Sequence, residues 1–170
     1  MFISNPSDAK KPLDDRHMLN MAYWADNYQV DVRKAYSKAR NLMSSRAKLA
    51  EFHFGYQSCV YTFDTGLAIK ISRIDPEHWA LTWRAEYGKR SFDLPIIAEG
   101  EIECKDGIKF HWSIVPCVRV CSWCNDDDDR LVNMVCKEIA DSTYHLQDFK
   151  TEQFGIWHGR AYLLDYNCAE

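Results

Sequence analysis

Two aspartates close to the C-terminus, Asp148 and Asp165, lie on either side of a short predicted turn. Lys150 and the amide Gln153 follow the first aspartate at close spacing. The second aspartate ends an apolar run, residues 161–164, that is typical of a buried strand. Two carboxylates, a lysine and an amide around one turn point to phosphoryl transfer.

The segment resembles the catalytic loop and metal-binding turn of protein kinases, in which H-R-D-L-K-P-E-N precedes a short hairpin and D-F-G. Asp148-Phe-Lys-Thr-Glu-Gln153 stands where D-L-K-P-E-N would be, and Asp165-Tyr-Asn167 stands where D-F-G would be. The resemblance implies that Asp148 positions the acceptor hydroxyl and that Lys150 offsets charge on the transferred group. It implies that Asp165 binds Mg²⁺, helped by the Gln153 oxygen, since magnesium prefers hard oxygen ligands.

A second part of the resemblance is the run Gly-Leu-Ala-Ile-Lys-Ile-Ser around Lys70. It is similar to the kinase V-A-I-K strand, whose lysine holds the α- and β-phosphates. Asp75 as N-cap and Pro76 behind it predict that a helix follows, and Glu86 shares one face of that helix with two tryptophans. A buried carboxylate needs a partner, so we expect Glu86 to pair with Lys70, with Glu77 as the weaker alternative.

The glycine-rich loop of kinases corresponds to residues 52–61, which have the rhythm of two strands joined by a turn. Gly55 is the one glycine at a family position, and it is the implied nucleotide contact because glycine lets the backbone approach phosphate oxygens. His53 and Ser58 replace the other glycines. The resemblance covers about residues 51–167 in order, and it is closest to the very short kinases of bacteriophages, which are also known among bacterial effectors.

The resemblance implies an ATP-dependent Ser/Thr protein kinase that uses ATP and Mg²⁺ and acts on a host protein. The alternative is a catalytically inactive pseudokinase that binds or inhibits a host protein. The missing loop glycines favour this alternative, as does the absence of an activation segment and an A-P-E motif after Asn167. The presence of Lys70, Asp148 and Asp165 favours the enzyme. A third interpretation is an unrelated α+β interaction domain whose resemblance is due to chance.

Composition restricts the class of protein further. With 170 residues, 46% of them hydrophobic, the chain can bury one substantial core. A net charge of -4 argues against nucleic acid as the main partner. We expect no membrane partner, because there is neither a secretory signal nor an apolar stretch of roughly 20 residues. Seven cysteines without framework spacing predict a reducing cytoplasm, that of the host if the chain is phage-encoded.

The expected fold class is α+β, and by the resemblance a truncated protein kinase-like fold. It would have an antiparallel small-lobe sheet, an N-terminal helical extension and a reduced helical large lobe. Residues 1–50 would be the extension and residues 51–170 the minimal kinase-like domain. Within that domain we expect the small lobe over residues 51–120 and the catalytic helix and hairpin over residues 125–170.

Apolar spacing predicts the elements that position these residues. One or two helices are expected within residues 14–50, with Val32, Ala35, Leu42 and Leu49 along one apolar stripe. Further along the chain, two strands are expected to form a hairpin joined at Lys105-Asp-Gly107.

The part of the chain before Asp148 is expected to be a hinge followed by a helix. Residues 117–124 would be the hinge beside the adenine pocket. The helix would begin at Asn125, where the carboxylates of residues 126–129 suit its N-terminal end. Its expected buried face is Leu131, Val135, Ile139 and Leu146.

Each candidate also has a structural interpretation. Lys70 would then lie on the solvent face of an alternating strand, and Glu86 would be an exposed residue at a helix end. Asp148 and Asp165 would be ordinary loop and strand-end acids, and Gln153 would be a turn residue.

Two metal sites are weaker alternatives. Cys121-Ser-Trp-Cys124 lacks the second cysteine pair or histidine pair of a zinc site. The run Asp126 to Asp129 lacks the ligand spacing of a calcium loop. We therefore expect a solvated helix start at this run.

Overall fold

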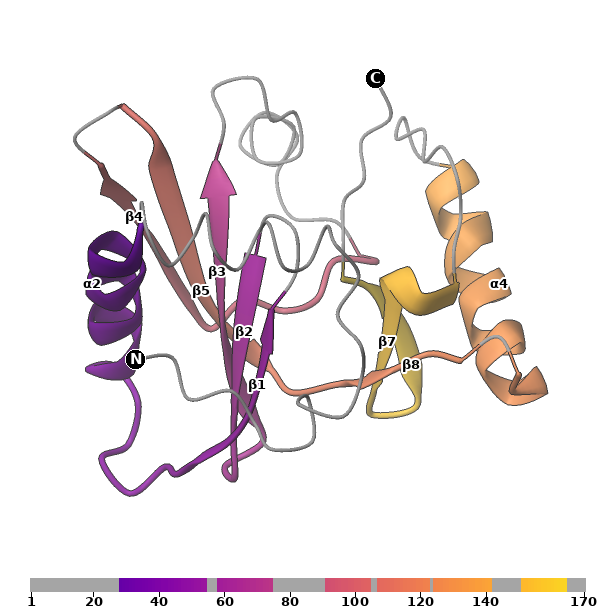
Figure 1. The fold of residues 1–170 in the computed structure, drawn as a ribbon. Coiled ribbons are helices and arrows are strands. Elements are labelled where there is room, and N and C mark those ends of the chain that lie inside the picture. Colours follow the sequence, from indigo (N-terminus) through magenta and orange to yellow (C-terminus); the bar gives the residue numbers. More distant parts are fainter. Residues whose placement is uncertain are drawn as a thin grey trace. The chain divides into compact units, whose positions relative to one another are not determined.

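The computed structural model describes residues 28–54, 58–74, 91–104, 107–122, 124–141 and 151–164 (Figure 1). These residues form an α+β fold with antiparallel strand pairing, as the sequence predicted. They fall into two compact units, one within residues 1–76 and 96–115 and the other within residues 77–95 and 116–170. The sequence had suggested a boundary near residue 120, and the first unit ends at Val115.

The first unit is a five-stranded sheet with one described helix. The strand order is β1-β2-β3-β5-β4, so β1 and β4 are the outer strands. The helix is α2 (Gln29–Arg40), and the strands are β1 (Leu49–Phe54), β2 (Ser58–Phe63), β3 (Leu67–Ile74), β4 (Ala98–Glu103) and β5 (Lys109–Pro116).

Helix α2 packs against one face of this sheet (Figure 1). Val32, Ala35 and Ala39 form its buried stripe, and they share one hydrophobic core with Ile69 and Ile71 of β3. Both isoleucines are fully buried. Burying a side chain of this size stabilises a fold by about 1.5–3 kcal/mol relative to leaving it exposed. This core is therefore what keeps α2 on the sheet.

The buried stripe of α2 is shorter than the sequence suggested. The prediction that Leu42 and Leu49 continue it is wrong, because their exposed fractions are 62% and 42%. The helix ends at Arg40, whose guanidinium donates to the carbonyls of Ser44 at 2.8 Å and Ala47 at 2.7 Å. These bonds hold a turn that leads the chain directly into β1.

The predicted hairpin between β4 and β5 is confirmed, with antiparallel register throughout. Gly100 of β4 lies opposite Trp112 of β5. A Cβ atom at Gly100 would lie 2.5 Å from Cζ2 and 2.8 Å from Cε2 of that indole, much closer than van der Waals contact. A glycine is thus required at this point of the strand because the Trp112 ring covers its backbone.

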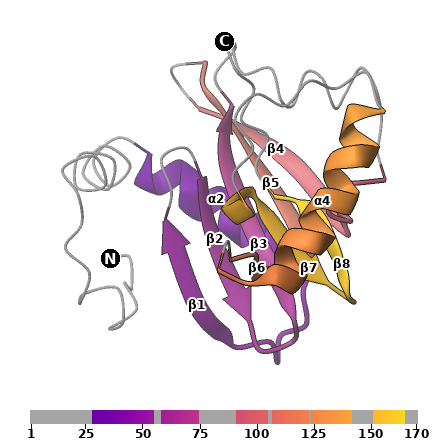
Figure 2. The same cartoon turned by 90° about the vertical axis from the view of Figure 1, so that its right-hand side faces the viewer.

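The second unit is built from a small sheet, a helix and a short 3₁₀ turn. The strand order is β6-β7-β8, and Figure 2 shows the helix α4 beside the β7–β8 hairpin. The elements are β6 (Arg119–Val120), α4 (Asp126–Ala140), η2 (Thr151–Gln153), β7 (Phe154–Trp157) and β8 (Arg160–Leu163). No helix in the described part of either unit has the length and apolar character needed to span a membrane.

The predicted helix after Asn125 is confirmed. The Asn125 side chain is its N-cap and accepts hydrogen bonds from the backbone N–H groups of Asp127 and Asp128. Val135 and Ile139 are buried as expected. Leu131 is half-buried instead, and Leu146 lies outside the described residues.

An ion pair joins α4 to β8. Arg160 donates to Glu138 at 2.7 Å, and the Ser91 hydroxyl donates to the same carboxylate at 3.0 Å. Leu163 of β8 also donates its backbone N–H to the Phe92 carbonyl at 2.9 Å. Residues 91–93 are therefore hydrogen-bonded to both α4 and the β7–β8 hairpin.

The packing at Gly100 gives a testable expectation. Gly100→Ala should lower the free energy of unfolding by about 1–3 kcal/mol, because the added methyl group overpacks against the Trp112 ring. Urea unfolding measures this loss. In a Trp112→Leu background, where the ring is absent, the same alanine should cost much less. An equal cost in both backgrounds would mean that the indole is not the obstacle.

Candidate functional site

Lys70 lies on β3, opposite Val60 of β2 in the antiparallel register. Successive residues of a strand point to opposite faces, and Ile69 and Ile71 face the core under α2. Lys70 is therefore on the face of the sheet opposite α2, where its side chain is half-buried. The burial of the Lys70 side chain is thus intermediate between the two predicted positions, an inward-facing phosphate ligand and a solvent-facing strand residue.

Polar residues of β5 share the Lys70 face, and the sequence analysis missed them. Phe110, Trp112 and Ile114 belong to the core under α2, so the alternating His111 and Ser113 lie on the other face. Both are buried, with exposed fractions of 9% and 4%. Strand β5 is next to β3, which brings this polar row beside the Lys70 strand. The sequence signal for this polar row is the alternation of polar with large apolar residues over residues 110–114.

His111 is fixed on this face by a neighbouring strand. Its Nε2 atom lies 3.0 Å from an Oε2 oxygen of Glu99 on β4. The imidazole is nearly buried, whereas the carboxylate is half-exposed. Lys70, His111 and Ser113 together form a polar face, and we use this name for the three residues. The polar face is the candidate site of the first unit.

Two other residues implied for the nucleotide site lie outside the described residues. Gly55 falls between β1 and β2 in the sequence, and Glu86 falls between β3 and β4. The Lys70–Glu86 ion pair therefore stays a prediction.

Gln153 is the candidate site residue described in the second unit. It ends the 3₁₀ turn η2 immediately before the β7–β8 hairpin, and it is buried, with an exposed fraction of 7%. Its backbone carbonyl accepts a hydrogen bond of 2.8 Å from the backbone N–H of Leu164. Leu164 is the residue before Asp165 in the sequence. The hairpin thus brings Gln153 against the residue that precedes the implied magnesium ligand.

The turn of this hairpin explains how the two strands meet. His158 and Gly159 both have positive φ values, 51° and 74°. Two such residues in a two-residue loop match the right-handed twist of paired strands. The predicted strand over residues 161–164 is confirmed as β8, with Ala161 and Leu163 buried. Asp148, Lys150 and Asp165 lie outside the described residues, so their predicted roles stay predictions.

The segment predicted as a hinge, residues 117–124, contains β6. Val120 of β6 pairs with Gly155 of β7, and the next residue, Cys121, donates its N–H to the Phe154 carbonyl at 2.8 Å. A side chain at Gly155 would collide with Val118 and Leu164. The segment is therefore packed closely onto the same hairpin that carries Gln153.

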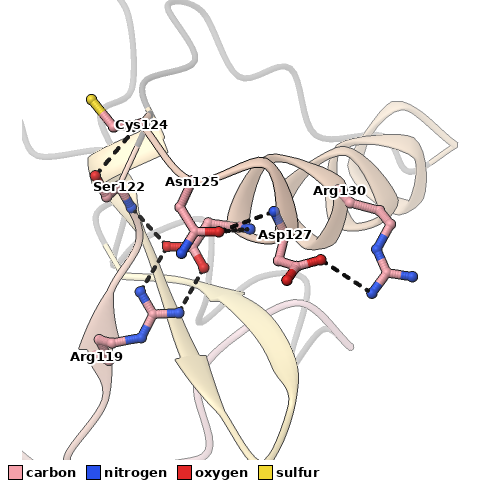
Figure 3. A network of polar contacts seen from close by, with 7 residues as sticks. Arg119, Ser122, Cys124, Asn125, Asp127 and Arg130 are labelled. Carbon is pink, nitrogen blue, oxygen red and sulfur yellow. Dashed lines mark hydrogen bonds and ion pairs between the residues drawn. The ribbon is translucent and has the colours of Figure 1, made fainter.

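Polar contacts between Arg119, Ser122 and the first turn of α4 hold the other end of this segment (Figure 3). Asp128 is 1% exposed, and both of its oxygens accept from the Arg119 guanidinium, at 2.6 and 2.7 Å. It also accepts from the Ser122 N–H at 3.0 Å. Bidentate pairs of this kind are the strong class of charge-assisted hydrogen bonds. The pair ties β6 to the first turn of α4.

This finding corrects the expectation of a solvated acidic run. Asp128 is followed by buried Val132, Val135 and Ile139 on one stripe of α4. The i, i+4, i+7 spacing was the signal that could have placed the carboxylate on the buried face. Hydrogen bonds from Arg119, and then from the Ser122 N–H, lower the pKa of the Asp128 carboxyl to about 2.

The alternative metal sites find no support. Within the described ranges, no group of three or more His, Cys, Asp or Glu side chains is placed to hold a metal ion. Burial, and then the nearby Asp128 charge, raise the pKa of the Cys121 thiol to about 11. At pH 7 the Cys121 thiol is therefore neutral, and it packs in the hydrophobic core of the second unit.

The Asp128 pair gives a pH-dependent expectation. Its pKa falls from 3.8 to about 2 on folding, so its stabilisation is complete above the unfolded value and disappears as the pH falls through the folded value. Asp128→Asn should therefore lower the urea midpoint clearly at about pH 6 and progressively less below about pH 4. Asp127→Asn is the matched control, because Asp127 lies on the exposed surface 3.9 Å from Arg130. Equal effects of the two substitutions would contradict the assignment.

No protein-family model matches the chain, and no curated protein matches its sequence.

Proposed function

We propose that the chain is a small kinase-like phosphotransferase that moves phosphate from ATP to a hydroxyl group of a host protein in the host cytoplasm. The observation that carries the proposal is the position of Lys70. It lies on the third strand of an antiparallel sheet, on the face opposite the α2 core. The phosphate-binding lysine of protein kinases also lies on their third strand, after a loop between the first two strands that covers the phosphates.

The arrangement in the second unit supports the same proposal. The kinase resemblance requires a hairpin between the catalytic loop and the magnesium-binding aspartate. Strands β7 and β8 form a hairpin at this place in the sequence, after Asp148 and before Asp165. Its register brings Gln153 against Leu164. The Gln153 side chain would offer an amide oxygen to a cation that prefers oxygen ligands.

The described residues that the resemblance implies for Mg²⁺-ATP have suitable chemistry. Lys70 supplies a cation for the phosphates, and Gln153 supplies an amide oxygen for the metal. The metal would neutralise charge that develops on the phosphates. Glu86 would orient Lys70, Asp165 would be the charged metal ligand, and Asp148 would orient the acceptor hydroxyl. Lys150 would offset charge on the transferred group, and Gly55 would let the backbone approach the phosphates.

The second candidate function is a binding module of the pseudokinase type, and one observation favours it. A cavity of about 660 Å³ in the first unit is lined by residues of α2 and β4. Lys70, the described residue that the resemblance implies for the nucleotide, is not among its lining residues. A protein-binding role would require a concave surface away from Lys70, and this cavity is such a surface.

Nucleotide binding is the first experimental test. Mg²⁺-ATP should raise the melting temperature, because a ligand that binds only the folded state stabilises it by about 2.7 kcal/mol at a hundred times its Kd. Lys70→Ala should abolish the rise. Lys109→Ala is the matched control, since Lys109 is also a strand lysine of this sheet but contacts Glu101. No rise for the wild type at millimolar ligand would exclude the enzyme and leave the binding module.

Catalysis is tested separately through Asp148. A carboxylate that orients the acceptor acts mainly in the transition state. Asp148→Asn should therefore bind Mg²⁺-ATP normally, while transfer of labelled phosphate to host proteins falls about a hundredfold or more. If the wild type and Asp148→Asn have equal effects in the cell, the phosphotransferase assignment is wrong and the binding module is favoured.

A further inference from the structure

A groove runs between α2 and the outer strand β4 of the first unit. Its volume is about 660 Å³, and it opens to solvent along one side. Its α2 side carries basic side chains, and its β4 side is formed by Ile102 and the two glutamates that flank it in the strand. The lining residues are Val30, Arg33, Lys34, Ser37, Lys38, Glu101, Ile102 and Glu103.

Strand β4 has an outer edge next to this groove. Among the described strands it pairs with β5 and with no other. The N–H of Cys104, just after β4, donates to the Ile108 carbonyl at 2.8 Å. Backbone groups of an antiparallel pair alternate between the partner and the outer side. By this alternation the N–H and C=O groups of Glu101 and Glu103 point away from β5, to the outer edge.

The two faces of this edge carry opposite charges. Ile102 is buried in the core under α2, so its neighbours Glu101 and Glu103 have their carboxylates on the other face. The Glu101 carboxylate is about half-exposed and lies 3.6 Å from the Lys109 ammonium. On the Ile102 face the groove is lined by Lys34 and Lys38 of α2, and the Lys34 ammonium also lies 3.5 Å from Asp31. A strand placed along β4 would thus meet carboxylates on one side and ammonium groups on the other.

We propose that the outer edge of β4 binds an extended segment of a partner protein by strand addition. The segment alternates basic residues, which face Glu101 and Glu103, with acidic residues, which face Lys34 and Lys38. One aliphatic residue among the acidic ones covers Ile102 and the exposed Val30, whose exposed fraction is 64%. In strand addition the main-chain hydrogen bonds supply affinity and the alternating side chains supply specificity. This binding goes beyond phosphate transfer and does not depend on it.

A second copy of this chain fits the edge less well than such a partner. Two β4 strands side by side would place glutamates against glutamates, and like charges opposite each other are destabilising. Charged residues on an outer strand are a common means by which proteins avoid self-association. The basic residues of α2 are not needed to prevent self-association. Together with the glutamates of β4 they form a site that carries both positive and negative charges.

The direct test uses the full chain and a synthetic peptide, Thr-Lys-Glu-Lys-Val-Lys-Glu-Lys-Thr. At low salt the peptide should bind and should slow hydrogen exchange at the amides of Glu101 and Glu103. Glu101→Lys combined with Glu103→Lys should weaken binding about tenfold or more, since both contacts become repulsive. Glu51→Lys is the matched control, because Glu51 is an exposed glutamate on β1, the other outer strand, and it should leave the affinity unchanged.

A second arm separates strand addition from simple charge attraction. The same peptide with methylated backbone nitrogens at alternate positions keeps its charges but cannot pair with a strand, so it should bind at least about tenfold more weakly. Glu101→Pro should also abolish binding while the chain stays folded, because proline is tolerated where the strand N–H faces outward. Equal binding of the methylated peptide, no binding at low salt, or a β4-dependent dimer of the free chain would each overturn the proposal.

Discussion

The alternation of side chains along β3 governs both the core of the first unit and the position of its candidate site. Ile69 and Ile71 must face α2, because both are fully buried in the hydrophobic core that they share with it. A strand that buries these two residues on one face must present Lys70 on the other. The same rule on β5 buries Trp112 under α2 and places His111 and Ser113 with Lys70. The packing of α2 on the sheet therefore helps to determine which residues form the polar face, although α2 contributes no residue to that face.

The second unit depends on a different constraint, the burial of a charge. Asp128 is placed on the buried stripe of α4 by helical spacing, and its carboxylate stays ionised because Arg119 and the Ser122 N–H bind it. Removal of one member of such a pair leaves a buried charge without compensation. This requirement holds β6 at the start of α4, and β6 in turn pairs with the hairpin that ends beside Gln153. The position of Gln153 thus depends on a series of contacts that runs from Asp128 through β6 to the β7–β8 hairpin.

The sequence predicted the elements better than their ends and their polar contacts. Strands β4 and β5, the helix after Asn125 and the strand over residues 161–164 were predicted from periodicity and turn residues, which are local signals. The exposure of Leu42 and Leu49 was not predicted, because α2 is ended by the bonds of the Arg40 side chain to carbonyls further along the chain. His111 and Asp128 were missed for a similar reason. Apolar patterns do not show which polar residues on a buried face have partners.

The central claim is that Lys70 lies beside the phosphates of a bound nucleotide. An ATP derivative with an acyl-phosphate group tests it most directly, because an amine next to the phosphates attacks the acyl carbon, forms an amide and releases the nucleotide. Mass spectrometry then identifies the acylated lysine. The account predicts acylation of Lys70, suppressed by excess Mg²⁺-ATP, with Lys109 on the same sheet unmodified. Acylation that avoids Lys70, or that persists unchanged with excess ATP, would contradict it.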